Sequence, residues 1–208
     1  MIKILVGIPT YDRRIDIDLM KIMMKVERLQ KYHLDFLFPV SSHLCRNRNI
    51  CCHTALKENY DYLLFIDSDT GINDETFIDK MLDTAYKFDA SVVGGAYRMK
   101  KPDMKEITYI AGKRTDEVGK YENLHGKLTK PQLVNSVGTG IMLINNIVLR
   151  QLEDPWFTII DKPNADVMPE DFEFCRKVEK KGFKIAIDPR FTTHHYGPIA
   201  WTHDVNKI

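Results

Sequence analysis

The sequence predicts one α/β domain in which helices cover a mostly parallel sheet. From residue 2 to residue 96, short apolar runs alternate with segments whose apolar residues recur at helical spacing. This alternation is typical of parallel strands joined by helices. The chain has 208 residues, which suffice for one well-cored domain and are too few for two ordinary ones. We therefore expect a single domain over residues 1–208.

The predicted elements of the first half alternate between strand and helix. Asp16 and Asp18 precede the first helical segment and suit its N-terminal turn through capping and the helix dipole. The run Tyr62–Ile66 is apolar throughout and predicts a buried strand. In chain order we expect a strand over 2–8, a helix over 19–29, a strand over 34–40, a helix over 46–59, a strand over 62–66, a helix over 77–85 and a strand over 90–96.

The second half has weaker periodicity. Residues 98–132 are rich in Lys, Gly, Asp and Pro, so we expect a long irregular excursion with one hairpin. Strands over 133–137 and 141–144 follow, and then a short helix. Pro169 opens a further helix, since a missing N–H costs nothing at a helix start, and Gly182 can end it. A last strand over 183–187 precedes a His-rich tail.

Composition excludes two classes of protein. Thirty basic against 29 acidic residues give a net charge of +1, without the basic field of a dedicated nucleic-acid binder. No stretch approaches the roughly 18 uninterrupted apolar residues of a membrane span, and the N-terminal apolar run is too short for a signal peptide. The four cysteines form no CxxC pair and suit a reducing compartment. We expect a soluble cytoplasmic protein that binds no nucleic acid and has no transmembrane segment.

Polar loops follow the first three predicted strands. Ligands of open α/β sheets bind beyond the carboxyl ends of the strands, so these loops predict a site for an anionic nucleotide. Tyr11 can stack on a base, and Arg46 and Arg48 can neutralise phosphates through their planar donors. The alternative for both arginines is a solvated first helical turn, although cations there oppose the helix dipole. The candidate donor contacts are Pro9, Thr10, Tyr11, Arg13, Arg46, Arg48, Asp67 and Ser68.

The segment Asp67-Ser68-Asp69 follows the buried strand over 62–66. Two carboxylates separated by one residue can share a hard cation, which can bridge diphosphate oxygens. The alternative is an Asx-rich turn with ordinary capping duties. An EF-hand is disfavoured because Gly71 and Ile72 stand where a ligand and a glycine are needed. A phosphatase of the haloacid-dehalogenase type is disfavoured as well, because Gly71 replaces the threonine that such a motif carries.

Seven sequence motifs follow one another along the chain: IPTYDRR at 8–14, CRNRNICCHTAL at 45–56, LLFIDSDTGI at 63–72, VVGGAYR at 92–98, VGTGIMLINN at 137–146, MPEDFEFCRKVEKKGFKIAIDP at 168–189 and HHYG at 194–197. This ordered set resembles the inverting, nucleotide-sugar-dependent glycosyltransferases of the GT-A type. The resemblance implies a Rossmann-like, mostly parallel central sheet flanked by helices, with a small irregular subregion in the second half. The compact size is similar to small viral or phage glycosyltransferase domains, which for a viral protein implies the host cytoplasm.

The resemblance also implies residue roles. Asp69 becomes the main ligand of Mn²⁺ or Mg²⁺, and Asp67 a second metal contact or a contact to the nucleotide ribose. His195 becomes a third metal ligand because Tyr196-Gly197 follows it, with His194 as an ambiguous neighbour. Asp171 becomes the base that activates the acceptor. The alternative for Asp171 and Glu170 is that both simply stabilise the first turn of a helix.

Together these observations predict a hexosyltransferase-like enzyme. Residues 1–96 would form its nucleotide-binding half and residues 97–208 its acceptor-binding and catalytic half. The donor would be a nucleotide-diphosphate sugar and the acceptor a glycan or another hydroxyl compound. The alternatives are a nucleotidyltransferase or phosphatase that uses the same acidic loop, and a noncatalytic nucleotide-sugar-binding module. The chain could also be part of a larger polypeptide.

Overall fold

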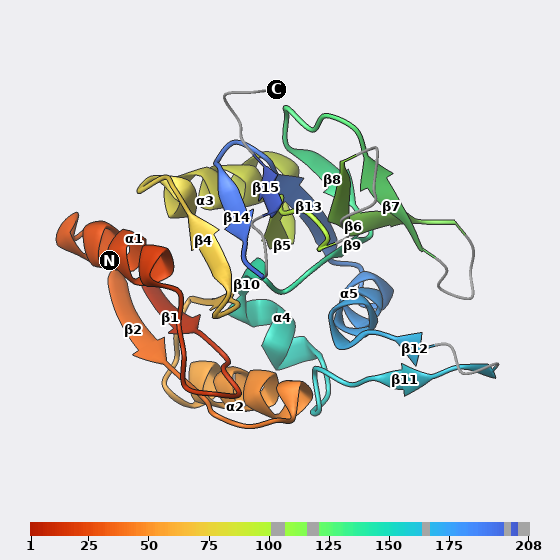
Figure 1. The fold of residues 1–208 in the computed structure, drawn as a ribbon. Helices are drawn as coiled ribbons and strands as arrows, with labels where there is room; N and C mark the ends of the chain where they lie inside the picture. Colours follow the sequence, from red (N-terminus) through yellow and green to blue (C-terminus); the bar gives the residue numbers. More distant parts are fainter. Residues whose placement is uncertain (101–106, 116–120, 164–166, 198–200, 204–208) are drawn as a thin grey trace.

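A seven-stranded sheet forms the centre of the computed structural model, which describes residues 1–100, 107–115, 121–163, 167–197 and 201–203 (Figure 1). The strand order is β2-β1-β3-β10-β5-β13-β8. Five strands run in one direction, while β10 and β8 are antiparallel to their neighbours. The sheet is therefore mostly parallel, as predicted. Its strands are β1 (Lys3–Gly7), β2 (His33–Leu37), β3 (Tyr62–Ile66), β5 (Ala90–Gly95), β8 (Gln132–Val134), β10 (Ile141–Asn145) and β13 (Lys184–Asp188).

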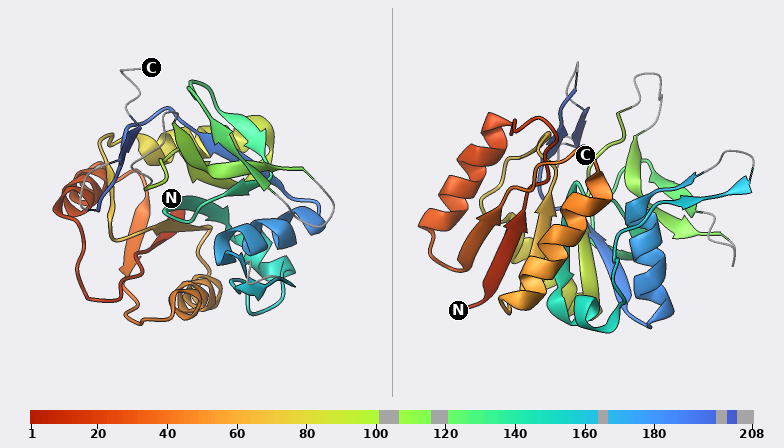
Figure 2. Two further views of the ribbon diagram at one scale, coloured as in Figure 1. Left: turned by 45° about the vertical axis from the view of Figure 1, so that its right-hand side comes forward. Right: turned by 90° about the horizontal axis from the view of Figure 1, so that it is seen from below.

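Helices pack on both faces of this sheet (Figure 2). On one face lie α1 (Ile17–Arg28) and α3 (Phe77–Phe88), and on the other lie α2 (Leu44–Lys57), α4 (Asn146–Gln151) and α5 (Glu170–Lys180). In β3, Leu64 belongs to the hydrophobic core on the face covered by α1 and α3, and Phe65 to the core on the face covered by α2, α4 and α5. Since successive strand residues point to opposite faces, an apolar run is the pattern that a strand buried on both sides requires.

The helix ends follow the predicted signals. The Asp16 side chain caps α1 by accepting a hydrogen bond of 2.8 Å from the backbone N–H of Asp18. Pro169 occupies the N-cap position of α5, so the helix begins one residue later, at Glu170. Gly182 follows the end of α5 with a φ of +84° and donates its N–H to the Glu179 carbonyl at 2.8 Å. Glycine adopts this left-handed conformation without a steric penalty.

Two small three-stranded sheets accompany the central sheet. The predicted hairpin is confirmed: β6 (Thr108–Arg114) pairs antiparallel with β7 (Tyr121–His125), and β6 also pairs with β9 (Ser136–Val137). The other sheet contains β4 (Thr70–Ile72), β14 (Thr193–His195) and β15 (Trp201–His203). The prediction of one strand over 133–137 was wrong, because the chain changes sheets at Asn135 between β8 and β9.

A short ribbon of β11 (Ile160–Asp161) and β12 (Val167–Met168) projects beside α5 (Figure 1). Among the described residues, no helix combines the length and apolar character needed to cross a membrane.

Candidate functional site

The first candidate site lies where the order of the central sheet changes direction. From β1 the chain passes to β2 on one side and later to β3 on the other. Such a switch point forms a crevice beyond the carboxyl ends of the strands. A cavity of about 350 Å³ lies there. Its lining includes these residues predicted to bind the donor or the metal: Pro9, Thr10, Tyr11, Asp67, Ser68 and Asp69.

Asn47 joins two of the loops that line this cavity and was not singled out from the sequence. Its side chain is buried, and its Nδ2 donates to the carbonyl of Ser41 at 3.0 Å and to that of Thr10 at 3.4 Å. Tyr11, on the neighbouring loop, is 77% exposed. The cavity therefore combines a fixed frame with an aromatic ring that is free to stack on a planar ligand.

The three predicted arginines lie in different environments. Arg13 and Arg46 are exposed and do not line the cavity. Arg48 is 2% exposed, so a solvated helical turn is the wrong interpretation for this residue. Its Nη2 donates to Asp67 Oδ1 at 3.3 Å, and its Nε lies 3.2 Å from Glu170 Oε1. A buried guanidinium requires such partners, since the loss of hydration is costly.

Asp69 lines the same cavity. One of its carboxylate oxygens pairs with the ammonium group of Lys100, and the other lies 3.9 Å from His195 Nε2. His195 Nδ1 lies 2.9 Å from the Arg98 carbonyl oxygen, which can only accept, so Nδ1 carries the proton and Nε2 keeps its lone pair. Burial lowers the pKa of His195, which favours the neutral ring.

These groups fit a divalent cation in part. Metal-binding histidines commonly donate their other N–H to a backbone carbonyl, as His195 does. Asp69 and His195 would supply two ligands, and Asp67, across from them, is turned toward Arg48. Within the described ranges, no three acidic, histidine or cysteine side chains are already gathered around one point. Mn²⁺ and Mg²⁺ commonly take remaining ligands from water and substrate phosphates.

The neighbouring His194 points elsewhere, as expected for successive residues of a strand. Its Nδ1 lies 3.0 Å from Thr202 Oγ1, and its ring stacks on Tyr196 at a centroid distance of 5.8 Å. His194 also lines a separate cavity with Asp18. Of the two histidines, His195 is therefore the one beside Asp69.

The turn between β9 and β10 supports this edge of the sheet. The backbone N–H of Gly140 donates to the Tyr97 hydroxyl at 2.9 Å, and the Gly140 carbonyl accepts from the N–H of Asp67 at 3.1 Å. A Cβ at Gly138 would lie 2.1 Å from the same hydroxyl. The two glycines therefore allow the turn to approach Tyr97 and to hold the start of the acidic loop.

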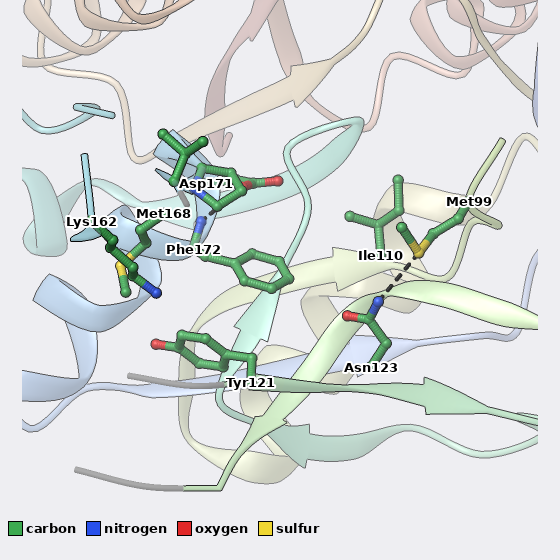
Figure 3. Close-up of a pocket in the computed structure, with 10 residues that line it drawn as sticks. Met99, Ile110, Tyr121, Asn123, Lys162, Met168, Asp171 and Phe172 are labelled. Carbon is green, nitrogen blue, oxygen red and sulfur yellow. Dashed lines mark hydrogen bonds between the residues drawn. The ribbon is translucent and has the colours of Figure 1, made fainter. Parts of the chain in front are cut away.

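The second candidate site is a cavity of about 390 Å³ at the start of α5 (Figure 3). Asp171 lines it, and Asp171 Oδ1 accepts a hydrogen bond of 2.8 Å from the Phe172 N–H. Burial raises the pKa of Asp171 to about 7, Glu170 adds to the rise, and Arg48 opposes it. A pKa near neutrality is the value that a general base needs. The residues that line this second cavity are Met99, Ile110, Tyr121, Asn123, Lys162, Val167, Met168, Pro169, Asp171 and Phe172.

Glu170 and Asp171 have different surroundings although they are adjacent in the first turn of α5. Glu170 is buried against Arg48, whereas Asp171 lines the cavity. Arg48 thus lies between Asp67 of the first cavity and the acidic pair of the second. The buried guanidinium of Arg48 therefore links the two sites.

These observations define the class of the protein: an α/β domain with a large, mostly parallel central sheet, flanked by helices, and two cavities along one edge. No protein-family model and no curated protein matches the chain. Among solved structures, A197 from STIV is similar with a TM-score of 0.66 and 19% identity, over 95% of this chain and 86% of that one. At this identity the likeness shows the fold alone.

Proposed function

We propose that this protein is a metal-dependent glycosyltransferase of the GT-A type, which moves a sugar from a nucleoside-diphosphate sugar to an acceptor hydroxyl with inversion. The carrying observation is the pair of cavities at the two sides of Arg48. One is lined by Asp67 and Asp69, and the other by Asp171. Two cavities with different chemistry suit a reaction between two substrates.

The donor would occupy the switch-point cavity. Tyr11 would stack on its base, and the exposed Arg13 and Arg46 are available to its phosphates. Asp69 and His195 would hold Mn²⁺ or Mg²⁺. When bound, such a cation neutralises the charge that develops on a departing diphosphate.

The acceptor would occupy the cavity beside Asp171. The Asp171 carboxylate takes the proton from the acceptor hydroxyl while the hydroxyl oxygen forms a bond to the anomeric carbon. The bond from that carbon to the diphosphate oxygen breaks, and its electron pair leaves with the nucleoside diphosphate. Attack opposite the leaving group inverts the anomeric configuration. Arg48 would hold Asp67 and Glu170 on the two sides of this reaction.

A nucleotidyltransferase or phosphatase and a noncatalytic binding module remain the competing functions. A second cavity with a carboxyl group of near-neutral pKa favours proton removal from a second substrate.

A thermal-shift screen of nucleotide sugars, with and without Mn²⁺, tests the donor, because a ligand that binds the folded state raises its apparent stability. The best donor would then be incubated with a mixture of glycosides and other alcohols. We expect free nucleoside diphosphate and an inverted glycoside by NMR. Release of pyrophosphate would indicate nucleotidyl transfer, inorganic phosphate a phosphatase, and binding without any product a noncatalytic module.

A further inference from the structure

Two aromatic rings form one wall of the cavity beside Asp171. The rings of Tyr121, from β7, and Phe172, from α5, lie with centroids 5.0 Å apart and planes inclined by 63°. In Figure 3, the Asp171 carboxylate lies on one side of the Phe172 ring and Tyr121 on the other, while Ile110 and Met99 face them. This wall offers broad apolar contact to a ligand that has a flat, nonpolar face.

Polar groups are set within this apolar wall. The Asn123 amide and the Asp171 carboxylate both belong to the lining of the cavity. The Asn123 amide donates to the sulfur of Met99 at 3.2 Å, and sulfur is a weak acceptor. An alkyl chain would offer these groups no further hydrogen bond in place of the water that it displaces, which is unfavourable. A ligand with several hydroxyl groups would satisfy them.

The charges around the cavity disfavour an anionic ligand. Asp171 lines the cavity, and Glu170 lies directly behind it. The guanidinium of Arg48 is already held by Glu170 and Asp67. Among the described residues of the lining, Lys162 is the one basic residue. A phosphate or carboxylate on the ligand would meet like charge near Asp171.

We infer that this cavity binds a neutral pyranoside, which lays its C–H face on Tyr121 and Phe172 and presents a hydroxyl to the Asp171 carboxylate. A cavity of about 390 Å³ lies in the lower part of the range for small-molecule sites, so it holds a terminal sugar unit. The role of that hydroxyl as the attacking group rests on the proposed function. The binding itself requires no donor.

The test is saturation-transfer NMR on the donor-free protein. The probes are the methyl glycosides of glucose, galactose, mannose and N-acetylglucosamine, the corresponding glucuronide, glucose 6-phosphate and cyclohexanol. We expect at least one neutral glycoside to bind, with stronger saturation on the protons of one ring face. The glucuronide, the phosphate and cyclohexanol should bind more weakly than that glycoside.

Tyr121→Leu and Phe172→Leu should each weaken that binding about threefold to tenfold, the loss expected for one aromatic contact. Tyr86→Leu is the matched control, because Tyr86 is 91% exposed on α3 and lines neither cavity. If Phe172→Leu unfolds the protein, Tyr121→Leu still decides the question.

Three results would overturn the inference: tighter binding of an anionic probe, binding that both variants leave unchanged, or no binding of any neutral glycoside. Failure of the proposed function is separate, because it would appear as absent transfer despite intact glycoside binding. Conversely, transfer to a noncarbohydrate alcohol alone would support the proposed function and refute the pyranoside.

Discussion

Asp171→Asn should make the protein more stable at alkaline pH while it abolishes most of the activity. The pKa of Asp171 is raised from 3.8 to about 7, mainly by burial. Well below pH 3.8 the carboxyl group is protonated in both the folded and the unfolded chain, so it costs no stability. As the pH rises, the unfolded chain ionises first, and the stability lost to this group is complete above about pH 7.

A rise of about three in the pKa of Asp171 corresponds to a loss of folding stability of about 4 kcal/mol, at 1.36 kcal/mol for each pKa unit. Asp171 is only partly buried and lines a cavity, so we expect about half of this value. Asparagine keeps the oxygen that accepts the Phe172 N–H and removes the charge. The melting temperature of Asp171→Asn should therefore exceed that of the wild type by about 4–8 °C at pH 8 and differ little at pH 4.

The same variant should lose turnover by about 100-fold to 10,000-fold, the usual contribution of a general base, while donor binding by calorimetry is retained. The control is Glu75→Gln, at an exposed position near α3, whose melting temperature should follow that of the wild type at both pH values. An equal loss of stability at pH 4 and pH 8, or near-normal turnover, would refute the assignment of Asp171 as a buried base.

Further predictions concern the other groups of the two cavities. Glu170→Gln should reduce turnover much less than Asp171→Asn in the same assay, because Glu170 faces Arg48 rather than the second cavity. Arg48→Met should lower kcat more than it raises the donor KM and should shift the acid limb of the pH–rate profile to higher pH, since Arg48 lowers the pKa of Asp171. A selective rise in donor KM would instead make Arg48 a phosphate ligand. Removal of the buried cation can cost about 3–5 kcal/mol of folding stability. If Arg48→Met therefore fails to fold, Arg48→Lys tests the same point. Asp69→Ala should abolish the effect of Mn²⁺ on nucleotide binding in calorimetry, and equally tight binding by the wild type in excess chelator would remove the metal from the mechanism.

Local patterns predicted the elements that carry the site. The apolar run of β3 and the start of α5 by Pro169 are both decided by neighbouring residues, so periodicity and capping signals suffice. The same local patterns also predicted that Asp67 and Asp171 lie at the edge of the sheet. The antiparallel direction of β10 could not be predicted in this way, because an apolar run has the same pattern in either direction.

Burial of Arg48 could not be predicted from its helix alone. The partners that compensate its charge are Asp67 and Glu170, which are 19 and 122 positions away in the chain. The second cavity likewise needs side chains from the β6–β7 hairpin and from the β11–β12 ribbon. Neither segment has a periodicity that indicates its place in the fold.

The position of β10 has a consequence for how the protein is made. β3 and β5 follow one another in the chain, yet β10 separates them in the sheet and forms hydrogen bonds to both. During synthesis both strands therefore leave the ribosome with an unpaired edge until residue 145 has emerged. Exposed apolar edges invite association between chains. A fragment ending at residue 96 should consequently aggregate, and addition of a peptide that spans Ile141–Asn145 should reduce this aggregation, as measured by light scattering.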